Sequence, residues 1–128
     1  MLEAELYAVL LNVLSNAIKS VIAAGGQKRI CIWARREGKR ALIHVLDTGI
    51  GLEEADYEKV FQPFTADPDD RLYRGLKEKL NPEDQYVVGT GSGLGLSIVS
   101  EILSYRGGEV HFVPPSESWK AELEMTLP

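Results

Sequence analysis

A run of alternating glycines constrains this chain more than any other feature. Residues 89–99 read G-T-G-S-G-L-G-L-S-I-V. Glycine tolerates positive φ angles and lets another molecule approach the backbone, but by propensity it begins neither a helix nor a strand. Ser92 is a suitable N-cap, and the apolar residues after it recur with a helical period: Leu94, Leu96, Ile98, Val99, Ile102 and Leu103. The glycines therefore lie where a helix begins.

A glycine loop at the start of a helix can bind an anion. Free N–H groups and the positive end of the helix dipole point at the loop, and missing side chains leave room for phosphate oxygens. We infer a polyphosphate site, and a glycine linker without a ligand is the alternative. Two other phosphate loops are excluded, because no lysine follows the glycines as in a Walker loop and no G-x-G-x-x-G is completed.

The first part of the chain predicts a long helix. Residues 3–24 contain no Gly or Pro, and their apolar residues recur with a 3.6-residue period. Gly25 and Gly26 end this helix. Leu11, Ile18 and Ile22 widen the apolar surface, so we expect most of the helix circumference to be covered.

The narrow polar stripe of this helix holds Asn12, Asn16 and Lys19, which fall within about 60° of one another. A buried amide without a partner costs about 1–3 kcal/mol, so these amides need something to bind. Asparagine oxygens suit the octahedral shell of Mg²⁺, which takes further ligands from water and from nucleotide phosphates. A solvated helix face is the alternative interpretation.

Two strands follow, at 29–36 and 40–47, and the second leads into D-T-G-I-G-L. A carboxylate followed by two glycines often forms only an Asx turn. The functional interpretation is a buried Asp47 that accepts a hydrogen bond from an exocyclic amine, with Gly49 and Gly51 leaving space for a flat ring. Adenine offers that amine, whereas guanine presents an acceptor at the same edge. Such a site selects ATP over GTP.

The rest of the chain completes the expected fold. The segment at about 65–90 is long and charged, which is typical of a lid. Residues 109–113 and 119–127 predict two more strands. We therefore expect an α/β (α+β) two-layer sandwich with a mixed, mostly antiparallel sheet and helices on one face. His44 and His111 are strand residues with no carboxylate or second histidine at ligand spacing, so they are assigned no chemistry.

Charge and cysteine content exclude several classes of protein. A formal net charge of -5 and a pI near 5.0 disfavour nucleic acid and acidic membranes as partners. The single Cys31 excludes a disulfide framework and a cysteine zinc cluster. We find no signal peptide and no apolar run of membrane-spanning length, and so expect a cytoplasmic domain without direct membrane insertion.

Three stretches, N-V-L-S-N-A-I-K, D-T-G-I-G-L and G-S-G-L-G-L-S-I-V, occur in the order and approximate spacing of the N, G1 and G2 boxes of one family. V-F-Q-P-F at 60–64 is similar to its F box. The chain thus resembles the catalytic and ATP-binding domain of two-component sensor histidine kinases. Their GHKL group also contains gyrase, the MutL repair proteins and a heat-shock chaperone ATPase. The resemblance implies a Bergerat ATP-binding fold over residues 1–128.

The resemblance also implies a role for each matching residue. Asn16 matches the Mg²⁺ ligand, and Asn12 and Lys19 match positions that contact the metal or the phosphates. Asp47 matches the aspartate that binds adenine. The other matches lie beside the base, in the phosphate loop or at the head of the next helix: Gly49, Gly51, Gly91, Ser92, Gly93, Leu94, Gly95 and Leu96.

The implied activity is binding of Mg²⁺-ATP and donation of its γ-phosphoryl group to a histidine on a separate dimerisation and phosphoacceptor domain, which then serves a response regulator. No phosphoacceptor histidine box is found, so the catalytic histidine is expected elsewhere. The strand that precedes the N box in the family is not found either. Ser20 stands where many members carry an aromatic residue against adenine. Alternatives are another GHKL ATPase, an anti-sigma serine kinase, or a degenerate module that binds a partner without nucleotide.

Overall fold

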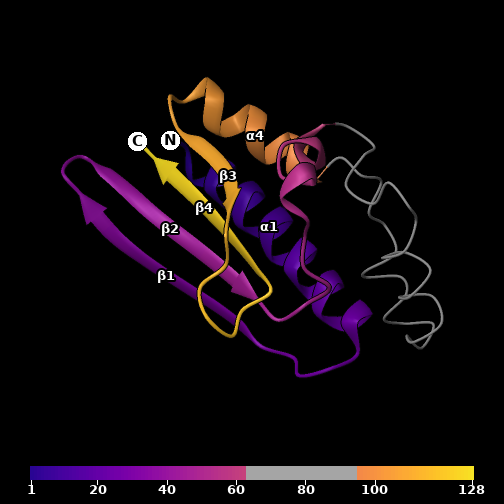
Figure 1. Ribbon diagram of the computed structural model, residues 1–128. Coiled ribbons are helices and arrows are strands. Elements are labelled where there is room, and N and C mark those ends of the chain that lie inside the picture. The colour runs from indigo at the N-terminus through magenta and orange to yellow at the C-terminus, as the bar shows by residue number, and fades with distance from the viewer. Residues whose placement is uncertain (63–94) are drawn as a thin grey trace.

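The computed structural model describes residues 1–62 and 95–128 (Figure 1). The predictions for the lid at about 65–90 and for Gly91, Ser92, Gly93 and Leu94 lie outside these residues. The described elements, in chain order, are α1 (Glu3–Ala24), β1 (Ile30–Glu37), β2 (Arg40–Asp47), the short 3-10 helices η1 (Glu54–Asp56) and η2 (Lys59–Phe61), α4 (Gly95–Tyr105), β3 (Glu109–Val113) and β4 (Ala121–Leu127).

The four strands form one sheet in the order β1-β2-β4-β3. Helices α1 and α4 lie side by side and cover one face of it (Figure 1). This two-layer α/β arrangement confirms the predicted fold class. All three strand pairs of the described residues are antiparallel, so this part of the sheet is antiparallel rather than mixed.

Helix α1 has the predicted bounds. It ends at Gly25, whose φ of 74° is the left-handed conformation that terminates many helices. One side of α1 is buried, including Val9, Val13 and Ala17. Leu11 is 68% exposed and Ile18 is 43% exposed, so the prediction that most of the circumference is covered is wrong for the described part of the chain. The sheet and α4 meet the helix on one side only.

By length and composition alone, α1 could cross a membrane, with a mean hydropathy of 1.6. The prediction that no apolar run of that length exists is therefore wrong on these two measures. The helix nevertheless packs Val9, Val13 and Ala17 into the core cluster. Its hydropathy is high because the exposed residues Leu11 and Ile18 add to those of the core face.

The hairpin of β1 and β2 turns at Gly38, whose φ is 62°. Strand β4 begins two residues later than predicted. The N–H of Trp119 donates to the carbonyl of Ser116 at 3.0 Å and closes a turn there, while the N–H of Lys120 donates to the carbonyl of Asp47 at 2.9 Å. The loop before β4 is thereby tied to the end of β2.

The core lies between the sheet and the two helices. Its largest fully buried side chains are Leu103, Met125, Val9 and Val99. Phe61 packs against this core, with its ring centroid 5.7 Å from that of Phe112.

The outer face of the sheet carries a polar cluster that the sequence analysis did not predict. Nδ1 of His44 lies 2.6 Å from Glu122, and Nε2 lies 3.0 Å from Glu124 without hydrogen-bond geometry. Glu124 also lies 2.9 Å from Nε2 of His111, and Trp33 stacks on His44. Sequence spacing gave no sign of these carboxylate partners, because strand register brings them to the histidines.

Candidate functional site

The end of β2 places the Asp47 carboxylate inside the protein, where the residue is 5% exposed. Oδ1 of Asp47 accepts a hydrogen bond from the Gly49 N–H at 2.8 Å, which is the Asx turn given above as the alternative. Burial raises the pKa of Asp47, while hydrogen bonds from Gly49 and Ser20 oppose that rise. The turn is formed and the carboxylate is buried, so the two interpretations are compatible.

Ser20 fastens this loop to helix α1. Its Oγ accepts a hydrogen bond from the Ile50 N–H at 3.0 Å and also bonds the Asp47 carboxylate. A Cβ on Gly49 would lie 2.0 Å from the same Oγ and 2.6 Å from the Ser20 carbonyl carbon. The need for glycine at position 49 therefore follows from its contact with the helix, and it does not depend on a ligand in the pocket.

Gly51 needs glycine for another reason. Its φ is 75°, and a Cβ there would lie 3.2 Å from the carbonyl oxygen of Lys120. The left-handed conformation turns the chain away from β2 after Ile50. Gly51 also lines a pocket.

One pocket brings together residues that are far apart in the sequence. Four of the predicted site residues line it: Asn16 from α1, Asp47 from β2, Gly51 from the following loop and Leu96 from α4. The other lining residues are mostly apolar: Ser20, Ile50, Leu52, Val60, Phe112 and Ala121. A pocket with one carboxylate, one amide and apolar walls suits a flat ring that carries a single hydrogen-bonding edge.

The three residues of the predicted polar stripe have different surroundings. Asn12 donates from Nδ2 to the carbonyl of Ala8 at 2.6 Å, and its Oδ1 would lie 3.1 Å from a Cβ on Gly95. Asn16 lines the pocket, and its amide bonds none of the described residues. Lys19 is half-buried, and burial lowers the pKa of its ammonium group. Only Asn16 is thus placed with its amide free at the pocket.

The start of α4 is the described part of the predicted phosphate loop. Gly95 is its first residue and contacts Asn12, and Leu96 is buried against the pocket. The close approach of Asn12 to Gly95 joins the two helices where the loop enters α4. A side chain at this position would press on the amide oxygen.

Several pocket residues were missed by the sequence reasoning. Phe112 and Ala121 come from the segments of β3 and β4, which were predicted only as strands. Val60 lies in the F box, which was noted without a role at the pocket. Ser20 was noted only as a missing aromatic residue. The signal for its role was a small polar residue at a family position that usually carries an aromatic one, in a chain whose G-I-G loop has backbone N–H groups to bind.

Metal binding would rest on amide oxygens. Within residues 1–62 and 95–128, no group of three or more His, Cys, Asp or Glu side chains is placed to hold a metal ion. Asn16 offers one neutral oxygen, and a hard ion such as Mg²⁺ binds with few protein ligands when phosphates and water complete its shell. The donor set therefore fits a metal that arrives with a nucleotide.

The family described as "Histidine kinase-, DNA gyrase B-, and HSP90-like ATPase" matches residues 1–128. The sensor histidine kinase WalK of Bacillus subtilis is 34% identical over 120 residues, which are 94% of this chain and 17% of that protein. The circadian input-output histidine kinase CikA of Synechococcus elongatus is 32% identical over 102 residues, covering 80% of this chain and 11% of that protein. The chain thus spans less than a fifth of these relatives' length.

Solved structures share the fold. The mycobacterial sensor histidine kinase MprB superposes with a TM-score of 0.67 at 22% identity, covering 98% of this chain and 70% of that one. Full-length ShkA in complex with AMPPNP gives a TM-score of 0.67 at 25% identity, covering 98% of this chain and 22% of that one. The same arrangement of helices and sheet therefore occurs in histidine kinase structures.

Proposed function

Because the chain belongs to the family of histidine kinase-, DNA gyrase B- and HSP90-like ATPases, we propose that it binds Mg²⁺-ATP and donates the γ-phosphoryl group to a histidine on a separate phosphoacceptor domain. The observation that carries the proposal is the convergence of Asn16 and Asp47 on one pocket from elements distant in the sequence. A cytoplasmic location is part of the same proposal.

Asp47 would recognise the base. Its Oδ1 is already held by the Gly49 N–H, which orients the carboxylate so that the second oxygen can accept from an exocyclic amine. Leu52, Val60 and Phe112 provide apolar surface for the ring faces. A base that presents a carbonyl at this edge would set two acceptors against each other, so adenine is preferred over guanine.

Asn16 would hold the metal side of the nucleotide. Its amide is free of bonds to the described residues and opens on the same pocket as Asp47. Bound Mg²⁺ would supply charge neutralisation at the phosphates. Lys19 and the first turn of α4 would add positive potential near them. Phosphoryl transfer requires of a protein mainly the alignment of the reacting groups and the stabilisation of charge. These residues can contribute to both.

The accepting imidazole would come from outside this chain. Relatives such as WalK are named as sensor histidine kinases and are several times longer than the matched region. His44 and His111 do not line the pocket that holds Asn16 and Asp47, because both lie on the outer face of the sheet. We therefore assign the acceptor to a dimerisation domain, with a response regulator downstream.

The test is calorimetry with ATP and Mg²⁺ on the wild type and on Asn16→Ala, with Gln27→Ala as the control for an exposed amide. Wild type and control should bind, and Asn16→Ala should lose the Mg²⁺-dependent part of the affinity while retaining its unfolding transition. An Asn16→Ala protein that binds Mg²⁺-ATP like the wild type would remove Asn16 from the site.

The acceptor is tested with labelled ATP and candidate phosphoacceptor domains. Transfer should give one acid-labile, alkali-stable phosphohistidine per acceptor. Steady ATP hydrolysis without transfer would favour another GHKL ATPase, and an acid-stable phosphoserine would favour a serine kinase. A folded domain that ignores millimolar nucleotide would be a partner-binding module, and the proposal would fail.

A further inference from the structure

The loop between β3 and β4, residues 114–120, adjoins the candidate nucleotide pocket. The N–H of Lys120 donates to the carbonyl of Asp47 at 2.9 Å, and the carbonyl oxygen of Lys120 lies 3.2 Å from where a Cβ on Gly51 would stand. The next residue, Ala121, lines the pocket and pairs with Asp47 in the sheet. The position of this loop therefore influences where Asp47 and Gly51 lie.

Backbone preference alone does not give this loop its shape. Ser118 has a φ of 75°, a left-handed conformation that is unfavourable for a residue with a side chain. Such a conformation persists where surrounding contacts fix it. Within the loop, the N–H of Trp119 donates to the carbonyl of Ser116 at 3.0 Å. From β1, the guanidinium group of Arg29 lies over the Trp119 ring, 5.0 Å from its centroid.

Glu122 fastens the other side of the loop. One oxygen of its carboxylate, Oε1, accepts from the Ser116 N–H at 2.9 Å and from the Ser116 hydroxyl at 2.6 Å. Glu122 is only 5% exposed. Burial acts to raise the pKa of Glu122, but hydrogen bonds from Ser116 and His44 outweigh burial and hold that pKa below its ordinary value. The loop is therefore bound to an ionised carboxylate, and charged acceptors form the stronger hydrogen bonds.

His44 orients that carboxylate from β2. Its Nδ1 lies 2.6 Å from the second oxygen, Oε2, and its ring stacks on Trp33 with the centroids 4.1 Å apart. An ionised carboxylate only accepts hydrogen bonds, so Nδ1 carries the hydrogen between them. A buried charge is stable only with partners of this kind. His44 and Glu122 thus form one unit on the outer face of the sheet, and the loop is attached to it.

We propose that Glu122, oriented by His44, is a positioning residue for base recognition, because it fixes the loop at 114–120 and through that loop the place of Asp47. Neither Glu122 nor His44 lines the pocket, so both act from the opposite face of the sheet. Since Asp47 is the proposed acceptor for adenine, this role rests on the function proposed above.

The test variant is Glu122→Leu, which removes the acceptor for the loop and leaves an apolar side chain on the sheet. Ser116→Ala should act in the same direction with a smaller effect, because it removes one of the two hydrogen bonds to the carboxylate. Glu122→Gln is the conservative variant. Its amide oxygen can still accept from Ser116, and its amide hydrogen can face a ring nitrogen of His44, so it should behave like the wild type.

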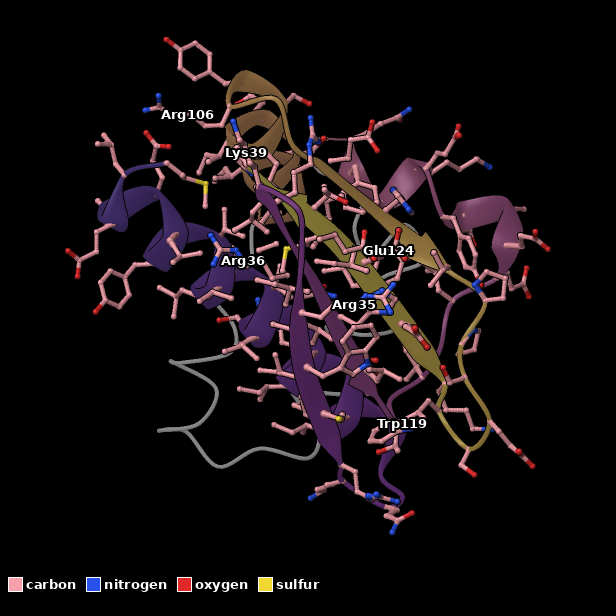
Figure 2. The ribbon with its side chains drawn as sticks, turned by 90° about the vertical axis from the view of Figure 1, so that its left-hand side faces the viewer. Arg35, Arg36, Lys39, Arg106, Trp119 and Glu124 are labelled. Atoms are coloured by element: carbon pink, nitrogen blue, oxygen red, sulfur yellow. The ribbon has the colours of Figure 1, made fainter. Side chains whose placement is uncertain are left out.

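Glu124→Leu is the matched control. Glu124 is the next outward-facing residue of β4, and its carboxylate lies 3.0 Å from Nε2 of His44 and 2.9 Å from Nε2 of His111. Among the described residues these two histidines are its charged partners, and neither belongs to the loop. In Figure 2, Glu124 lies on the side of Trp119 that leads toward Lys39 at the hairpin. The control therefore removes the same charge beside the same histidine but no contact of the loop.

Calorimetry with Mg²⁺ compares ATP with the triphosphate of purine riboside, which is ATP without the exocyclic amine. A displaced Asp47 weakens only the hydrogen bond to that amine, so Glu122→Leu should lower the ratio of the two affinities roughly fivefold. A loss of stability alone would weaken both ligands together and leave the ratio unchanged. Glu122→Gln and Glu124→Leu should keep the wild-type ratio.

Amide hydrogen exchange followed by NMR tests the fastening without nucleotide. Exchange in Glu122→Leu should be faster at Gly49, Ile50 and Lys120, because the N–H groups of these three residues are bonded around Asp47. Amides on the core face of α1 should exchange as in the wild type. If Glu122→Leu does not fold, Ser116→Ala takes its place, with an expected fall of about twofold in the affinity ratio.

Unchanged exchange at the three amides would overturn the fastening of the loop by Glu122. Faster exchange with a wild-type affinity ratio would overturn its role in base recognition. Equal effects of Glu122→Leu and Glu124→Leu would also overturn it, since they would trace the change to His44 alone. A wild type that binds the two triphosphates equally would instead refute base recognition by Asp47, and this role of Glu122 would fail with it.

Discussion

Gly49 and Gly38 flank the same strand, β2, for unrelated reasons. Gly49 follows the buried end, where a Cβ would lie 2.0 Å from Ser20. Gly38 precedes the exposed end, where a Cβ would meet nothing within 4 Å but φ is 62°. Packing demands glycine at one end and backbone conformation demands it at the other. Substitution should therefore cost much stability at the buried end of β2 and little at the hairpin end.

The comparison predicts its largest effect for Gly49→Ala. The added methyl group must displace the backbone of α1 or of the loop, so the free energy of unfolding should fall by about 3 kcal/mol, and nucleotide affinity should fall with it. Urea unfolding measures the first quantity and calorimetry the second. Gly26→Ala is the control, since nothing lies within 4 Å and its φ is not positive. A stable Gly49→Ala protein would show that the contact is not rigid.

Asp47→Asn should separate binding from stability at the buried end. The amide can still accept from the Gly49 N–H, but it no longer offers a charged acceptor to adenine. Loss of a charge-assisted hydrogen bond corresponds to a roughly tenfold to hundredfold weaker affinity. Calorimetry with ATP measures that change, and unchanged affinity would exclude Asp47 from base recognition.

The same substitution has a predicted pH signature. Burial raises the pKa of Asp47 in the folded state above its ordinary value of 3.8, so the folded protein binds more protons than the unfolded chain between the two pKa values. The wild type should therefore lose stability as pH rises from about 3.8 to the raised value. Asp47→Asn should lack this loss. If the unfolding free energies of the wild type and Asp47→Asn changed with pH at the same slope, the pKa of Asp47 would not be raised in the folded state.

Ser20→Ala should have an intermediate effect. It leaves the Ile50 N–H without an acceptor and removes a donor to Asp47, for a loss of about 1–2 kcal/mol in unfolding free energy. Nucleotide affinity should fall severalfold because the loop is less fixed. Ser104→Ala removes an exposed hydroxyl of α4 and serves as the control. Equal stability of the two variants would mean that Ser20 does not fasten the loop.

Gly38→Ala should have the smallest effect of the four. A side chain at φ 62° costs about 1 kcal/mol, and no neighbouring atom needs to move. Nucleotide affinity should be unchanged, since the hairpin is at the far end of β2. Thermal unfolding and calorimetry measure both quantities. A loss as large as that of Gly49→Ala would abolish the distinction between the two ends of the strand.

Local sequence determined the elements and their order. The bounds of α1 followed from the absence of Gly and Pro before Gly25, and β2 and β3 from their composition and turn residues. The D-T-G-I-G-L loop and the two asparagines of α1 were recognisable because their chemistry is unusual for a strand end and an apolar helix. These signals lie within one turn or one loop, where backbone propensity and periodicity act.

Contacts between distant residues were decided only by the tertiary structure. Asn12 and Asn16 lie on the same face of α1, one turn apart. Asn12 nevertheless bonds the carbonyl of Ala8, whereas Asn16 lines the pocket. Ser20 meets the loop at Gly49 and Ile50, and Glu122 meets His44, through packing and strand register. Neighbours of this kind depend on how helix and sheet are placed, and nothing in the local sequence specifies the distance between them.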